Sequence, residues 1–283
     1  MVDVAYFRRV DAADPAAGSA VLSPEEVARA LWAGGAQIRG SAVSGALAAA
    51  AEWVASVRGA PGLRPVRWSL DLFRPAAMRE CVTVGKVVRS GRRLCLVDTV
   101  LLQGEVEVAR GSALFLAPGP VAADPAWVSE WPLELPPTGL RPRTTEPRLY
   151  YSEGVGWTGG PHEHAPGGRM RTWLFDVPVV EGESPSPFQL AAMAGDVANL
   201  MTNWGRDGLA YINPDLGVLL ARLPIGDGIG IAPELRTEHD GLVTGVATLF
   251  DRAGTFGTAS ISALPSPSGP IDPRRQGALL RND

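Results

Sequence analysis

Residues 33–54 read AGGAQIRGSAVSGALAAAAEWV, a glycine pair followed by a run of alanine and serine with almost no charge before Glu52. Alanine is the strongest helix former, and its small side chain allows neighbouring strands to approach a helix closely. The stretch therefore predicts a plain helix over 41–57, held by a curved antiparallel sheet. Seventeen residues span roughly 25 Å, about the width of five strands.

A second helix with the same character lies 148 residues downstream. It is predicted over 188–204, from the stretch FQLAAMAGDVANL onward. Both helices are followed by alternating, β-branched runs that predict antiparallel strands. These runs are 66–75, 81–91, 92–104 and 105–117 in the first half, and 210–224, 228–237, 241–252 and 255–265 in the second. Shorter strands are predicted near 4–10, 148–157 and 169–178. Arg74 and Arg222 end matching runs, so an internal duplication is expected.

A proline-rich stretch separates the two halves and predicts three parts of the chain. Residues 1–117 form the first half, 118–146 a linker that neither a helix nor a central strand can cross, and 147–283 the second half. Trp127, Trp131 and Leu135 give the linker more apolar surface than a free tether carries. We therefore expect it to pack along one half.

Composition excludes several classes of function. The net charge is only −4 and no block of like charge stands out, which argues against nucleic acid or a membrane as partner. The N-terminal segment lacks the apolar core of a secretory signal, so a cytoplasmic protein is expected. Cys81 and Cys95 are expected to be reduced core residues. His162 and His164 have no third metal ligand nearby and are expected in an exposed loop, and no metal or cofactor is predicted.

Four stretches in this order and spacing resemble one family. They are GGAQIRGSAVSGAL, VRWSLDLFRPAAM, FQLAAMAGDVANL and YINPDLGVLLARLP. Together they resemble the double-hotdog acyl-CoA thioesterases, a thioesterase-like branch distantly similar to acyl-CoA thioesterase II. The resemblance covers nearly the whole chain and implies an α+β fold of two tandem hotdog halves, each a long helix wrapped by a curved antiparallel sheet. It further implies an acyl-CoA substrate, bound where the helix of one half meets its neighbour.

The same resemblance implies roles for particular residues. Asp196 matches the family's helix aspartate and is the candidate base that activates water, while the duplication places Ala48 at the matching position of the first helix. Asn213 matches a strand threonine and would help to place the water. Asn199, one turn beyond Asp196, is a candidate substrate contact. The glycine-led start of the first helix, at Gly34, Gly35 and Ala36, would border the substrate and offer backbone N–H groups to the thioester oxygen.

Plainer interpretations remain open at each position. Gln189, Asp196, Asn199 and Asn203 could form a solvated stripe, although aspartate and asparagine are poor in helix interiors. Asn213 could simply begin a strand before Pro214. Ile261 stands where the family has a glutamine and cannot orient water. This departure favours an alternative function, in which the protein binds acyl thioesters with little or no hydrolysis. Ile261 would then be one of the residues that line the substrate pocket.

Two further expectations concern the reaction class and assembly. A hotdog hydratase would need an Asp and His pair, and all three histidines lie outside the predicted helices. Thioester hydrolysis is therefore the favoured reaction, with a free carboxylic acid and CoA as products. Exposed edges of the paired sheets would allow a homodimer.

Overall fold

A computed structural model describes residues 4–11, 19–30, 36–120, 123–124, 126–127, 133–143, 146–165 and 167–272. The first half contains β1 (Phe7–Asp11), β2 (Ser19–Pro24), α1 (Gly40–Arg58), β3 (Arg64–Leu72), β4 (Cys81–Ser90), β5 (Leu94–Gln103) and β6 (Val106–Leu116). The second half opens with β7 (Arg148–Ser152), β8 (Gly156–Thr158), β9 (Met170–Leu174) and α2 (Pro187–Thr202). It continues with β10 (Trp204–Gly205), β11 (Gly208–Leu209), β12 (Tyr211–Ile212), β13 (Asp215–Leu220), β14 (Ile229–His239), β15 (Leu242–Asp251) and β16 (Gly254–Pro265).

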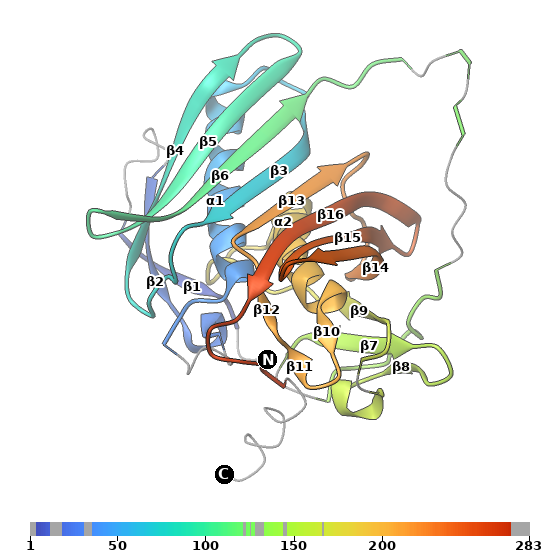
Figure 1. The fold of residues 1–283 in the computed structure, drawn as a ribbon. Coiled ribbons are helices and arrows are strands. Elements are labelled where there is room, and N and C mark those ends of the chain that lie inside the picture. Colours follow the sequence, from blue (N-terminus) through green and yellow to red (C-terminus); the bar gives the residue numbers. More distant parts are fainter. Residues whose placement is uncertain are drawn as a thin grey trace.

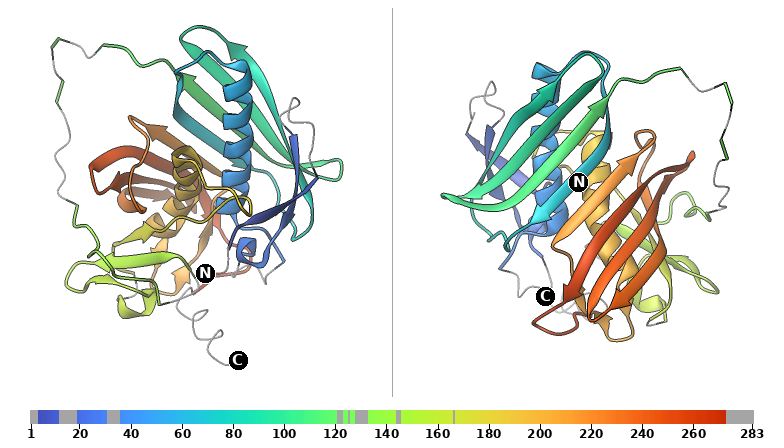
Figure 2. Two further views of the ribbon diagram at one scale, coloured as in Figure 1. Left: turned by 180° about the vertical axis from the view of Figure 1, so that it is seen from behind. Right: turned by 45° about the horizontal axis from the view of Figure 1, so that its top comes forward.

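One large antiparallel sheet joins the two halves. Its strand order is β1-β2-β4-β5-β6-β3-β13-β16-β15-β14-β9-β7-β8, and β3 and β13 meet in the middle. Both helices lie on the same side of this sheet (Figures 1 and 2). The predicted α+β class is confirmed, and both helices lie within about two residues of the predicted ends. Strand β2 was not predicted.

The two halves correspond at an offset of 148 residues. Strand β5 shifted by this offset falls on β15 at both ends, and β4 shifted in the same way begins where β14 begins. At the junction of the halves, Ser69 of β3 pairs with Gly217 of β13, its own counterpart. The hydroxyl of Ser44 donates to the carbonyl oxygen of Ala192, again its own counterpart, at 2.7 Å. Contacts between counterparts are what a twofold axis through the junction requires, so the halves are related by an approximate twofold.

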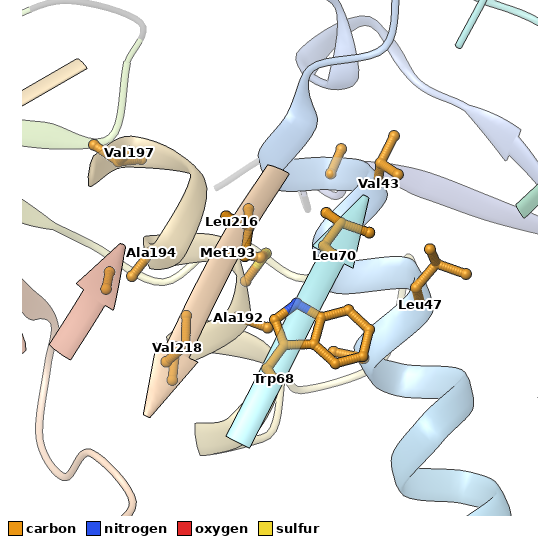
Figure 3. Packing of buried hydrophobic residues seen from close by; sticks show 14 of the residues in the cluster. Val43, Leu47, Trp68, Leu70, Ala192, Met193, Ala194, Val197, Leu216 and Val218 are labelled. Carbon is orange, nitrogen blue, oxygen red and sulfur yellow. The ribbon is translucent and has the colours of Figure 1, made fainter. Parts of the chain in front are cut away.

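The core at this axis explains the alanine-rich helices. Trp68 of β3 is fully buried against both helices, and its ring meets that of Phe188 edge to face with centroids 6.0 Å apart. The indole N–H donates to the Ser44 hydroxyl at 3.0 Å, so its polar atom is satisfied. Figure 3 shows Trp68 on β3 beside Val218 of β13, with Met193 of α2 and Leu47 of α1 close by. Alanines on both helices leave room for this indole while keeping helix propensity high.

The second part of the linker packs as expected. Leu133 and Leu140 pack against Leu149, Trp173 and Phe250 of the second half. The Arg252 side chain donates to the carbonyl oxygen of Pro136 at 3.2 Å, which fixes the chain there. Trp127 departs from the expectation, because 88% of its surface is exposed. Trp131 lies outside the described residues.

Neither helix is both long and apolar enough to cross a lipid bilayer, within the part of the chain that the structure describes.

Candidate active site

The carboxylate of Asp196 lies at the N-terminus of the opposite helix. Asp196 sits midway along α2, and its side chain reaches Gly40, the first residue of α1. A Cβ atom added at Gly40 would fall 2.8 Å from Cγ of Asp196, and closer still to Oδ1. Only a residue without a side chain can occupy this position while the carboxylate stays in place. The contact brings one residue from each half into the same site.

The Asp196 carboxylate faces the first turn of α1. The residue before this helix, Arg39, makes no capping hydrogen bond through its side chain. Instead, the Asp196 carboxylate lies against Gly40 in the first turn, where the backbone N–H of Ser41 lowers its pKa. The positive end of the helix dipole favours an anion at this place, as does the supply of N–H groups that have no partner within the helix.

Asn213 contacts the same carboxylate. It lies between β12 and β13, and its amide donates to Oδ1 of Asp196 at 3.4 Å and to the carbonyl oxygen of Asp215 at 3.2 Å. The structure thus brings Asp196 and Asn213 together, although they are 17 residues apart in sequence. In this geometry the amide group holds the carboxylate directly.

Two opposing influences set the pKa of Asp196. Burial raises its pKa above the ordinary value, and this is the larger influence. Hydrogen bonds from Asn213 and from the Ser41 N–H lower it, as do the charges of Arg148 and Arg39. The net result is a carboxylate whose pKa is raised, which makes it a stronger base than an exposed aspartate while several donors still hold it in position.

A buried cluster of Arg39, Glu146 and Arg148 lies next to this carboxylate. Glu146 accepts from Arg39 at 3.0 Å and from Arg148 at 2.5 Å, and both arginine side chains are only 7% exposed. Burial opposes ionisation of Glu146, but the two guanidinium groups outweigh it and lower the pKa of Glu146 to about 2. The cluster carries a net charge of +1, which is opposite to that of Asp196. It therefore stabilises the charged form of the Asp196 carboxylate.

A small cavity of about 40 Å³ adjoins the site. Its lining includes Ser41 and Arg148, together with Met193 and Val197, which flank Asp196 along α2. A volume of this size admits one water molecule, which occupies about 30 Å³ in the liquid. The site therefore combines a held carboxylate with room for water nearby.

The asparagines beyond Asp196 are not part of a solvated stripe. Asn199 and Asn203 are 5% and 4% exposed. Asn199 donates to the carbonyl oxygen of Tyr211 at 3.2 Å and accepts from Asn203 at 2.8 Å, while Arg236 donates to Asn203 at 3.0 Å. The interpretation as a solvated face was wrong for these two residues, because their amides tie the end of α2 to the sheet. A substrate contact for Asn199 stays a prediction.

The remaining predicted site residues either lie away from the Asp196 carboxylate or fall outside the residues that the structure describes. Ile261 is 3% exposed on β16, in the main hydrophobic core, while its neighbours Ser260 and Ser262 are exposed on the other face. Ala36 is exposed, and its carbonyl oxygen accepts from the Met78 N–H. Gly34 and Gly35 fall outside the described residues. The glycine that meets the site is Gly40.

The prediction of an exposed loop at the two histidines is wrong for His164. Its ring is 3% exposed and lies within 2.7 Å of the Ser152 hydroxyl and 2.9 Å of the Thr158 hydroxyl. A short helical turn at Pro161–Glu163 folds His164 back onto Tyr150, which gives both ring nitrogens a partner. His162 is exposed, as expected.

Sequence reasoning missed Arg39, Gly40, Ser41, Glu146 and Arg148. The short stretch Arg39-Gly40-Ser41 at the start of the helix was a local signal, since glycine is a poor helix former and unusual inside a first turn. Glu146 had no such signal, because it lies 107 residues from Arg39 and within a proline-rich stretch.

A methyl group at Gly40 provides a direct test of the site geometry. Alanine in place of a helical glycine usually stabilises a helix by about 1 kcal/mol. Here the added Cβ would displace the Asp196 carboxylate, so Gly40→Ala is expected to lower kcat/KM for thioester hydrolysis by up to about 10²-fold. Gly45→Ala is the matched control, because its Cβ meets side-chain atoms of Met193 at 2.9 Å and of Val179 at 3.0 Å and does not approach Asp196. Equal activity of the two variants would contradict the proposed importance of the contact between Gly40 and Asp196.

Comparisons with known proteins agree with the expected family. The family description "Acyl-CoA thioesterase N-terminal domain" matches residues 28–116, and "Acyl-CoA thioesterase C-terminal domain" matches residues 119–260. A comparison with curated proteins finds no match.

Similar solved structures include the tesB protein of Mycobacterium avium subs paratuberculosis, at 15% identity and a TM-score of 0.61, covering 92% of this chain and 96% of that one. Acyl-CoA thioesterase II TesB2 of Mycobacterium marinum is 13% identical, with a TM-score of 0.60 and coverage of 92% and 95%. A conserved protein with hot dog fold from Alicyclobacillus acidocaldarius is 12% identical, with a TM-score of 0.62 and coverage of 89% and 94%. At such identities these likenesses establish a shared fold.

Proposed function

Because this chain belongs to the acyl-CoA thioesterase family, we propose that it hydrolyses an acyl-CoA thioester to a free carboxylic acid and CoA, with Asp196 activating the water. The observation that carries this proposal is the Asp196 carboxylate, which lies against Gly40 in the first turn of α1 and accepts a hydrogen bond from Asn213. A partly buried base with a raised pKa, next to a water-sized cavity, fits the needs of this reaction.

The chemistry follows from these groups. Asp196 accepts a proton from water as the water oxygen attacks the thioester carbonyl carbon. The carbonyl oxygen becomes negative, and backbone N–H groups at the positive end of α1 are suited to stabilise it. The C–S bond then breaks, and the CoA thiolate leaves and takes up the proton that Asp196 accepted, which restores the carboxylate. A thiolate is a good leaving group, so neither a strong nucleophile nor a metal is required.

The proposed architecture is a double hotdog. Residues 1–117 and 147–283 would be tandem hotdog halves joined by the linker 118–146. The approximate twofold, the antiparallel pairing of β3 with β13 and the one long helix on each half of the sheet support this division. The site would then use a carboxylate from the second half and a helix start from the first.

A binding protein without turnover is the second candidate. Ile261 supports it, because this buried apolar side chain stands where the family has a glutamine. The deciding experiment measures thiol release from acyl-CoAs of several chain lengths by the native protein. Release of CoA at a rate proportional to enzyme supports hydrolysis. Tight binding of the same compounds without release would favour the binder and overturn the proposed reaction.

The pH dependence of the reaction tests the role of Asp196. Its raised pKa means that the carboxylate becomes protonated at a higher pH than an exposed aspartate would, and a protonated carboxyl cannot accept a proton from water. We therefore expect kcat/KM to fall tenfold per pH unit on the acid side of this raised pKa. A rate profile that stays flat down to the ordinary range of aspartate would contradict this assignment.

A further inference from the structure

A cavity of about 960 Å³ lies beside α1, away from the Asp196 cavity. It follows α1 from Ala46 to Gly59, a length of roughly 20 Å at 1.5 Å per residue. Small side chains of this helix form its floor, and Phe115 of β6 and Val179 add apolar wall. Ligand pockets usually measure about 300–1,000 Å³, so this space can hold a molecule of cofactor or fatty acyl size.

A polar group lines one wall of this cavity. The Glu52 carboxylate accepts from the Ser186 hydroxyl at 2.5 Å and from the Gln189 amide at 3.1 Å. Ser186 is also the cap of α2, because its hydroxyl accepts from the Gln189 N–H at 3.1 Å. Glu52 and Gln189 both face the cavity. The start of α2 therefore carries a fixed carboxylate supplied by α1.

The approximate twofold relates this arrangement to the Asp196 site. The counterpart of Ser41 is Gln189, 148 residues later. Asp196 of α2 reaches Ser41 at the first turn of α1, and Glu52 of α1 reaches Gln189 at the first turn of α2. Glu52 lies one turn beyond Ala48, the counterpart of Asp196. The cavity, which Gln189 lines, thus lies beside the part of the first half that corresponds to the Asp196 site.

We propose that this cavity is a second acyl-thioester site, which binds a linear acyl chain along α1 with the thioester beside Glu52 and Gln189. The proposal rests on the proposed function, since the equivalence of the two sites identifies the ligand class. Binding there is without hydrolysis, because Ala48 stands where the base would be. Arg64 lines the cavity and is exposed, so it can meet a phosphate of the CoA moiety.

The test counts bound ligands. The probe is the non-hydrolysable thioether S-dodecyl-CoA, and its stoichiometry is measured by calorimetry on the full chain. Ala49→Trp places an indole in the cavity, whereas Val57→Trp on the same helix is the matched control, because Val57 is 51% exposed and does not line the cavity. We expect Ala49→Trp to bind one equivalent fewer than the native protein and Val57→Trp to bind as many.

The outcomes separate this proposal from the proposed function. Equal stoichiometry in the native protein and Ala49→Trp would overturn the second site. Thiol release from dodecanoyl-CoA by Ala49→Trp, measured in parallel at saturating substrate, is expected to match the native kcat, which also shows that the variant folds. If the native protein releases no thiol but Ala49→Trp still loses one equivalent, the hydrolase assignment fails and the second site stands.

Discussion

Asp196→Asn is expected to lower kcat for acyl-CoA hydrolysis by about 10²–10⁴-fold, the usual contribution of a general base. Asparagine keeps the size of the side chain and an oxygen that can cap α1 in place of the carboxylate. It cannot accept a proton from water. The measurement is thiol release at saturating substrate, compared with the native protein. Near-native turnover by Asp196→Asn would remove this residue from the chemistry.

The stability of Asp196→Asn distinguishes a catalytic role of this residue from a purely structural one. Folding raises the pKa of Asp196, so the contribution of this group to stability is greatest at low pH and is lost as pH rises through the folded-state pKa. Asparagine has no charge to bury. Asp196→Asn should therefore be at least as stable as the native protein at pH 7, and this advantage should shrink toward pH 4. A purely structural cap would instead show a loss of stability and little change in kcat.

Glu146→Gln is expected to reduce the free energy of unfolding by about 3–5 kcal/mol, since it leaves two buried guanidinium groups without their anion. Unfolding in urea, followed by circular dichroism, gives the comparison. Glu107→Gln is the control, because its partner Arg110 is 54% exposed and this exposed pair should contribute little.

A second readout ties Glu146 to the active site. With Glu146 neutral, Arg39 and Arg148 leave more positive charge near Asp196, which lowers the pKa of its carboxyl group. The acid side of the rate profile should move to lower pH in any folded fraction of Glu146→Gln. If Glu146→Gln leaves the pH profile of the rate or the free energy of unfolding unchanged, the cluster of Arg39, Glu146 and Arg148 neither shifts the pKa of Asp196 nor stabilises the fold as proposed.

The helices and most strands could be predicted because their signals are local. Alanine content marks α1, and an apolar run with β-branched residues marks β5, whose burial in the structure follows a period of two. The offset of 148 could also be read from the sequence, since both halves keep the same lengths between elements. Strand β2 was not predicted because the six residues Ser19–Pro24 form only a short, weakly alternating run that ends in a proline.

The candidate site could be predicted only in part, for a physical reason. Asp196 carries its own signal as an acidic residue inside an otherwise apolar helix. Its partners Gly40 and Ser41 acquire their role from the crossing of two helices, and Arg39 meets Glu146 across 107 residues. Such contacts depend on how the halves dock, which no window of sequence describes. The large cavity beside Glu52 is likewise formed by several elements that are distant in sequence, so no single stretch of sequence indicates it.

The pairing of Ser69 with Gly217 also bears on how the chain reaches its active form. This pair closes one of the longest loops in the fold. Closing a long loop costs conformational entropy, and this cost arises before the distant strands gain the contacts that stabilise them. We expect each half to form its own local hairpins early and the seam between β3 and β13 to join late. Because the carboxylate belongs to one half and the helix start that holds it to the other, a chain whose seam has not joined lacks the complete site. Catalytic competence would therefore appear only at the end of folding.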